Sequence, residues 1–283
     1  DTQLRLLEER LRYLRELGVQ PPQWRDPIRG LHPDRRTPGN SLGGWVCQRD
    51  GAPLPEEATY CQYLAWRAGE ALRSALTRGD GPLYLQLDFF APHQPFMVPE
   101  CYRERARELA EHIRLPASYH EAMSGGGERW PRVYHFYRRN WGLYDPETAR
   151  RYRLMNFLQI EALDAALGRF LATLDELGLY EDALVVFLGD HGEMNCERAL
   201  VDKGVYGHPK TALAPLAVKL PGGEGGGRSL EAPVSLLDVA PTVLELAGVQ
   251  PADRLDGESL LPLLEGERFR RSAPFIFECG WHV

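Results

Sequence analysis

The feature that most constrains the fold of this chain is an unbroken apolar run at residues 183–188, ALVVFL. A run of this length without alternation is typical of a strand covered on both faces, as in a parallel sheet between helices. Residues 146–177 precede it with leucines and phenylalanines at helical spacing, and Gly178 follows as a helix stop. A long helix leading into a buried strand predicts the α/β class.

The rest of the chain repeats this alternation. Helical spacing predicts further helices over residues 4–17, 56–76 and 235–247, and apolar density predicts strands over residues 83–90 and 216–220. The Pro- and Gly-rich residues 18–55 are expected to form a loop, and residues 91–147 an irregular surface excursion over a site. We therefore predict a doubly wound, mostly parallel sheet flanked by helices.

Charge and composition exclude several classes of function. The formal net charge of −7 and the pI near 5.7 disfavour nucleic acid or an anionic membrane surface as the main partner. There is no apolar run of the roughly 18 residues that a membrane span needs, and the first residues show no signal-peptide core. A cytoplasmic location is favoured, with an upstream signal peptide as the alternative. The oligomeric state is open.

The five cysteines form no C-x-x-C pair, and their number is odd. This spacing indicates neither a zinc knuckle nor a disulfide framework. We expect reduced, mostly buried thiols.

A candidate metal site follows the apolar run directly. Asp190 and His191 stand where the strand should end, and ligands bind beyond the carboxyl ends of strands in open α/β sheets. A carboxylate beside an imidazole can ligate a divalent cation, and Gly192 leaves room for close approach. The alternative is that Asp190 caps the next helix and His191 is merely exposed.

Two further segments offer donors for an anion. His93 lies between two prolines, at the end of the strand expected at residues 83–90, in a stiff loop that would fix the direction of the imidazole. Lys203 follows the Asp-His pair and could supply a positive charge to a tetrahedral oxyanion. Three neighbours, His208, Lys210 and Lys219, are alternatives that nothing local separates, except that Lys219 falls within an expected strand.

Six segments in order make the chain resemble sulfatases of the alkaline-phosphatase-like superfamily over roughly residues 56–278. They are APHQPF, LDAALGRFLATLDELGL, ALVVFLGDHGE, DKGVY with APLAVKLPG, SLLDVAPTVLELAGV, and LDGESLLPLL. The resemblance implies metal-dependent hydrolysis of a sulfate ester of a small molecule or carbohydrate. It implies that Asp190 and His191 bind the metal, usually calcium, and that His93 and Lys203 contact the sulfate group. His208 departs from the segment expected after the lysine, and its role is open.

The resemblance also implies parts that these residues do not contain. Relatives carry paired acidic metal ligands and then a Cys- or Ser-x-Pro/Ala-x-Arg motif, whose first residue is oxidised to formylglycine. The nearest match, at Cys101, has Arg103 where Pro or Ala belongs. We therefore expect a formylglycine upstream of Asp1, and we expect this chain alone to be inactive. The expected organisation is a helix and loop over residues 1–55, the C-terminal part of the sulfatase domain over residues 56–270, and the start of a further subdomain over residues 271–283.

Two alternatives to the sulfatase interpretation stay open. One is a phosphodiesterase or phosphonate monoester hydrolase of the same superfamily, which would use manganese or zinc. The other is a non-catalytic relative that binds anions. The aromatic and basic residues 134–141 are either part of a substrate rim or a packed surface excursion.

Overall fold

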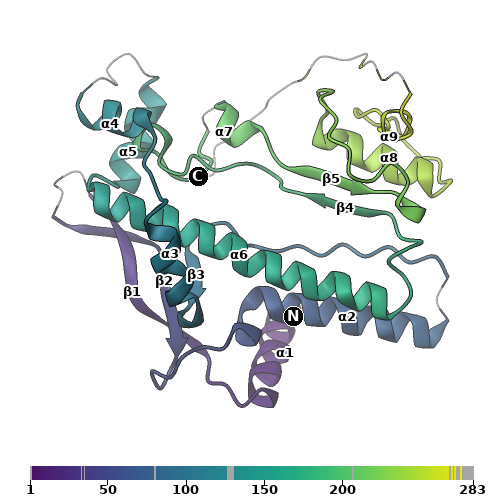
Figure 1. The fold of residues 1–283 in the computed structure, drawn as a ribbon, viewed down its shortest axis with the longest axis horizontal. Helices are drawn as coiled ribbons and strands as arrows, with labels where there is room; N and C mark the ends of the chain where they lie inside the picture. Colours follow the sequence, from purple (N-terminus) through teal and green to yellow (C-terminus); the bar gives the residue numbers. More distant parts are fainter. Residues whose placement is uncertain are drawn as a thin grey trace. The chain divides into compact units, whose positions relative to one another are not determined.

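The structure of the protein is a computed structural model that describes residues 2–32, 34, 36–79, 81–125, 131–205, 207–267, 269, 271 and 275. The chain divides into two compact units. Unit 1 comprises residues 1–178 and 193–206, and unit 2 comprises residues 179–192 and 207–283. Figure 1 labels the helices and strands of both units.

The helices of unit 1 begin and end where the sequence provides caps. Helix α1 spans Thr2–Glu16. In α2, Tyr60–Arg78, the Thr59 side chain accepts the first-turn N–H of Gln62, and Gly79 ends the helix in the left-handed conformation. In α6, Pro146–Glu176, the Asp145 side chain accepts the Thr148 N–H. The predicted helices are confirmed within a few residues, and α6 lies along α2 (Figure 1).

A three-stranded sheet forms the other half of unit 1. Strand β1, Pro22–Leu31, pairs antiparallel with β2, Pro38–Gln48, and β2 pairs parallel with β3, Phe96–Pro99. The prediction of a loop before residue 55 is therefore wrong. These strands are hard to predict from the sequence, because proline and glycine are uncommon inside strands. Strand β1 contains Pro27 at a register shift, and β2 contains Gly43, where a Cβ atom would lie 2.8 Å from Phe96.

The excursion expected over residues 91–147 is more regular than predicted. Besides β3 it contains α3, Arg103–Ala110, α4, Ala117–Met123, and α5, Arg132–Trp141. Helix α6 packs on the sheet and on α3. Buried side chains of the sheet, α4 and α6 form the core between them. These include Ile28, Leu42, Phe96, Val98, Tyr119, Tyr152, Met155 and Leu158.

The strand predicted over residues 83–90 is absent in the structure. The segment is extended, yet no strand among the described residues pairs with it. Tyr84 is 77% exposed and Phe90 60% exposed. Apolar density alone does not make a strand, because the backbone also needs hydrogen-bonding partners on at least one side.

Unit 2 contains a two-stranded sheet. Strand β4, Val185–Leu188, confirms the strand predicted from ALVVFL, and it pairs antiparallel with β5, Leu216–Lys219. The sequence favoured parallel neighbours for this strand, and the described residues contain none. The short helix α7, Pro209–Ala212, lies between the two strands in sequence. Helices α8, Val239–Leu246, and α9, Leu261–Leu264, follow β5.

The buried Asp238 joins two of the segments on which the resemblance rests. Its carboxylate accepts the Ser235 N–H at 2.7 Å, the Glu258 N–H at 2.9 Å and the Arg271 guanidinium at 2.5 Å. The Thr242 hydroxyl accepts the Leu260 N–H at 2.8 Å. The SLLDVAPT and DGES segments therefore hold α8 and α9 together.

Four of the five cysteines lie in the described residues, and all four are free thiols. Cys47, Cys61 and Cys196 are buried, as expected, whereas Cys101 is exposed. Cys279 lies outside the described residues, as does nearly all of the subdomain start expected at residues 271–283. Where the chain is described, none of its helices has the length and apolar character that crossing a membrane requires.

Candidate functional site

His93 lies in the loop between residues 83–90 and β3, and its ring is fixed on two sides. Its Nδ1 atom lies 2.5 Å from the Gln94 carbonyl oxygen, and its ring centroid lies 4.8 Å from that of Phe90, with the two rings tilted by 38°. Because a carbonyl oxygen only accepts, Nδ1 carries the proton and Nε2 of the neutral ring is an acceptor. Both flanking prolines, Pro92 and Pro95, follow cis peptide bonds.

Lys203 meets His93 from a segment 110 positions further along the chain. Its Nζ atom lies 2.8 Å from His93 Nε2, within hydrogen-bonding distance. The ammonium group donates to the acceptor face of the imidazole and keeps its other two N–H groups for further partners. The carboxylate of Asp202 lies 4.0 Å from the same Nε2 atom, too far for a hydrogen bond. Both residues predicted to hold an anion therefore lie together in unit 1.

The segment that carries Lys203 is held by one carboxylate that the sequence did not single out. Glu193 Oε1 accepts three hydrogen bonds, from the Asp202 N–H at 2.6 Å, the Asn195 N–H at 3.2 Å and the Tyr152 hydroxyl at 3.0 Å. Tyr152 is fully buried in α6. Glu193 therefore ties the backbone next to Lys203 to the longest helix of the unit.

The backbone between Glu193 and Lys203 is held in an unusual conformation. Five non-glycine residues here have positive φ angles, a region that side chains with a Cβ atom rarely adopt. They are Asn195, Cys196, Arg198, Ala199 and Asp202. Such angles persist only where the surrounding contacts impose them, and they gather at functional sites. The contacts of Glu193 supply part of that constraint.

Burial shifts the ionisation of this cluster. Loss of solvent raises the pKa of Glu193 to about 7, against the opposing effect of its backbone hydrogen bonds. Burial, followed by the nearby Glu193 carboxylate, also raises the pKa of Tyr152 well above its ordinary value. Tyr152 therefore acts as a permanent hydroxyl donor to Glu193.

Asp190 and His191 lie in unit 2, directly after β4, where the sequence places them. The Asp190 Oδ1 atom accepts the His191 N–H at 2.9 Å, and Oδ2 lies 3.6 Å from His191 Nε2. The Asp190 side chain is 86% exposed. The space at Gly192 is used by the chain itself, because a Cβ atom there would lie 2.0 Å from the Lys210 carbonyl oxygen.

The described residues do not form a complete metal site. Calcium takes about six to eight oxygen ligands. Within the described ranges no group of three or more His, Cys, Asp or Glu side chains is arranged to hold a metal ion. Asp190 and His191 supply two adjacent donors, which fits part of a ligand set but not a whole one.

The three alternatives to Lys203 lie in unit 2 with other contacts. Lys219 Nζ donates to the carbonyl oxygens of Glu181 at 2.8 Å and Ala183 at 3.1 Å, which agrees with its low rank among the candidates. The His208 side chain caps α7 by accepting the Lys210 N–H. Lys210 is exposed on that short helix.

Cys101, the nearest match to the nucleophile motif, has surroundings that oppose reactivity. Although the residue is exposed, neighbouring atoms shield its thiol from part of the solvent, and this desolvation, followed by the Glu56 carboxylate, raises the pKa of Cys101. A raised pKa lowers the fraction of thiolate, which is the nucleophilic form.

Comparison with known proteins agrees with the resemblance. The chain is 29% identical over 221 residues to the multifunctional alkaline phosphatase superfamily protein PehA of Trinickia caryophylli, covering 75% of this chain and 42% of PehA. It is 28% identical over 264 residues to the choline-sulfatase of Rhizobium meliloti (strain 1021), covering 88% of this chain and 50% of that protein.

The fold is that of the same superfamily. The structure of the phosphonate monoester hydrolase SpPMH from Silicibacter pomeroyi matches with a TM-score of 0.68 and 23% identity, covering 97% of this chain and 52% of that one. The chain therefore spans about half the length, or less, of these relatives. The sulfatase family profile matches residues 24–249, and the chain accordingly belongs to the sulfatase family.

Proposed function

We propose that the protein containing this chain hydrolyses a sulfate ester of a small molecule or carbohydrate, and that His93 and Lys203 hold the sulfate group. The observation that carries the proposal is the 2.8 Å contact between Lys203 Nζ and His93 Nε2. Two basic side chains that distant segments bring together are suited to an anion. Family membership supports the reaction class.

The two side chains can do separate work on such an ester. The remaining N–H groups of Lys203 can bind a sulfate oxygen and stabilise its negative charge as the ester bond breaks. When His93 Nε2 takes up a proton from solvent, that atom becomes a donor instead of an acceptor, and Lys203 keeps its positive charge. A protonated Nε2 can donate to the leaving oxygen, because Nδ1 stays bonded to the Gln94 carbonyl oxygen.

Members of the family generally use a divalent metal ion and a formylglycine nucleophile. We infer that Asp190 and His191 are two of the ligands of such an ion, since they lie together at the end of β4. The metal supplies charge neutralisation when it is bound. The 283 residues contain no Cys- or Ser-x-Pro/Ala-x-Arg motif, and this chain by itself is therefore proposed to be inactive.

A second candidate function is hydrolysis of a phosphonate monoester or phosphodiester. His191 favours it, because an imidazole nitrogen suits manganese or zinc better than calcium, which takes oxygen ligands.

Turnover by the full-length protein separates the candidates. An aryl sulfate, an aryl phosphonate and an aryl phosphodiester are compared under calcium, manganese and zinc. A higher kcat/KM for the sulfate supports sulfate-ester hydrolysis. A higher kcat/KM for either phosphorus ester, with manganese or zinc required, supports the second candidate function instead. If no ester is turned over with any metal while inorganic sulfate still binds, the protein is a non-catalytic relative that binds anions.

A further inference from the structure

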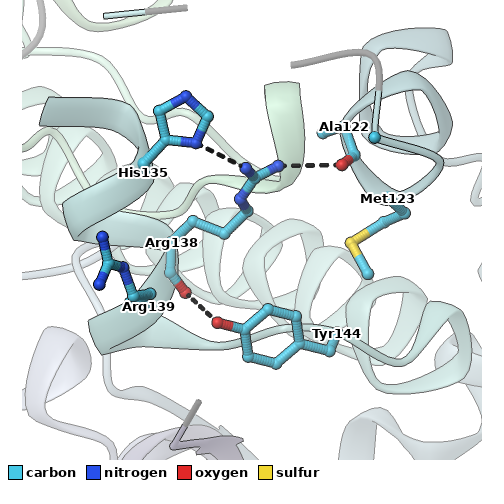
Figure 2. Close-up of a pocket in the computed structure, with 7 residues that line it drawn as sticks. Ala122, Met123, His135, Arg138, Arg139 and Tyr144 are labelled. Carbon is cyan, nitrogen blue, oxygen red and sulfur yellow. Dashed lines mark hydrogen bonds between the residues drawn. The ribbon is translucent and has the colours of Figure 1, made fainter. Parts of the chain in front are cut away.

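A cavity of about 410 Å³ lies in unit 1 between α4 and α5 (Figure 2). Its walls come from the end of α4, from one face of α5 and from Tyr144, which precedes α6. The lining residues are Ala122, Met123, Gly125, His135, Arg138, Arg139 and Tyr144. It shares no residue with the His93 and Lys203 pair.

The cavity has a positive lining in an acidic protein. Among the described residues that line it, three are basic and none is acidic, although the chain carries a net charge of −7. In the part of the chain that the structure describes, no carboxylate lies within ion-pairing distance of Arg139. A basic lining of this kind attracts anions.

The guanidinium of Arg138 is fixed at the centre of this lining, as Figure 2 shows. It donates to the Ala122 carbonyl oxygen at 3.0 Å and to His135 Nδ1 at 2.9 Å. Because arginine is always a donor, His135 Nδ1 must accept, and the ring proton is on Nε2. Arg138, Arg139 and His135 Nε2 therefore all present N–H donors in one lining. Tyr144 and Met123 add an aromatic and an apolar surface.

Both walls of the cavity contact the segment that leads to Lys203. On the α4 side, the Ser118 hydroxyl donates to Glu197 Oε1 at 2.7 Å and accepts the Arg198 N–H at 2.9 Å. On the α5 side, Tyr134 packs in a buried cluster with Met194 and Leu200. A ligand between α4 and α5 would therefore contact the two helices that hold the backbone leading to Lys203.

We propose that this cavity binds the carboxylate, sulfate or phosphate group of a small organic anion, with Arg139, Arg138 and His135 Nε2 as donors. Two sources have this chemistry. One is a second anionic group on the substrate ester, which rests on the function proposed above, and the other is a separate anion that occupies only this cavity.

The first test uses benzoate as a probe, since it carries a carboxylate and a ring but no group to transfer. Calorimetry compares the full-length protein with Arg139→Gln and with Arg132→Gln, a matched control at the start of α5 that does not line the cavity. Arg139→Gln should weaken benzoate binding about tenfold, and Arg132→Gln should leave it unchanged. Arg138→Lys, which keeps the charge but loses the two-pronged geometry, should also weaken it.

The second test separates the two sources by turnover of phenyl sulfate and 4-carboxyphenyl sulfate. If the ligand is part of the substrate, Arg139→Gln raises KM about tenfold for the carboxylated ester only. If the ligand is a separate anion, both esters are unaffected while benzoate binding is weakened. Benzoate binding that is equal in Arg139→Gln and the unchanged protein, or undetectable in the unchanged protein, overturns the proposal. The calorimetric test needs no turnover, so its outcome is independent of the sulfatase assignment.

Discussion

The two pairs of candidate residues differ in how the fold holds them. His93 and Lys203 come from segments 110 positions apart and meet at 2.8 Å within one compact unit. Asp190 and His191 are neighbours in sequence, and the Asp190 side chain is 86% exposed. The first pair exists only when unit 1 is folded, whereas the second is set by the local end of β4. Changes in the surroundings should therefore disturb the first pair and spare the second.

The largest expected effect is on the first pair. Lys203→Ala should lower kcat/KM for an aryl sulfate in the full-length protein about 100- to 1000-fold, because a half-buried positive charge that stabilises the transition-state oxyanion is lost. Lys210→Ala, which removes an exposed lysine seven positions further on, should stay within twofold. Equal activity of both variants would mean that Lys203 is not part of the sulfate site.

Asp190→Ala tests the second pair. Turnover by the full-length protein should fall about 10- to 100-fold at limiting metal and recover partly as the metal concentration rises, because a ligand is lost while others remain. The free energy of unfolding should change by less than about 0.5 kcal/mol, since the side chain is exposed and makes only local contacts. Loss of turnover that no metal concentration relieves would contradict the role as a metal ligand.

Glu193→Gln tests how the first pair is supported. The pKa of Glu193 is raised from 4.5 to about 7, so the folded state binds more protons than the unfolded state between these pH values. The contribution of Glu193 to the free energy of unfolding is therefore greatest at low pH. It falls by up to about 3 kcal/mol as the pH rises towards 7. Urea unfolding at several pH values should show this decline in the unchanged chain and not in Glu193→Gln.

Glu121→Gln, an exposed change on α4, is the matched control and should leave the pH dependence of stability as it is. The same slope in all three proteins would mean that Glu193 ionises as it does in the unfolded chain.

The smallest expected effect is that of Tyr152→Phe. It removes one of three hydrogen bonds to Glu193 and leaves the buried ring in place, which should cost about 1 kcal/mol of unfolding free energy. Thermal unfolding of the two proteins measures it. The cost should shrink in the Glu193→Gln background if the two groups act together, and an undiminished cost would show that they do not.

Helices could be predicted from this sequence and the sheet of unit 1 could not. Periodic leucines and the caps at Thr59 and Asp145 are local signals, and α2 and α6 follow them. Strands β1 and β2 carry prolines and glycines at register shifts and close approaches, which look like loop. The extended residues 83–90 show the opposite error, because apolar composition does not reveal whether a backbone partner exists.

The candidate site was predictable only in part. A resemblance of ordered segments pointed to His93 and Lys203, but no local pattern shows that they meet. The supporting role of Glu193 was missed, because a glutamate in the GDHGE segment looks the same whether it is exposed or bonded to Tyr152 from α6. Long-range hydrogen bonds of this kind leave no periodicity in the sequence.

The most direct test of the central claim is a double-mutant cycle on the pair. His93→Gln, Lys203→Met and the double variant of the full-length protein are compared by kcat/KM for an aryl sulfate. If the two side chains hold one sulfate group through their 2.8 Å contact, the double variant should lose little more than the worse single variant. Losses that simply multiply would mean that the two residues act independently, and the account of a joint sulfate site would be wrong.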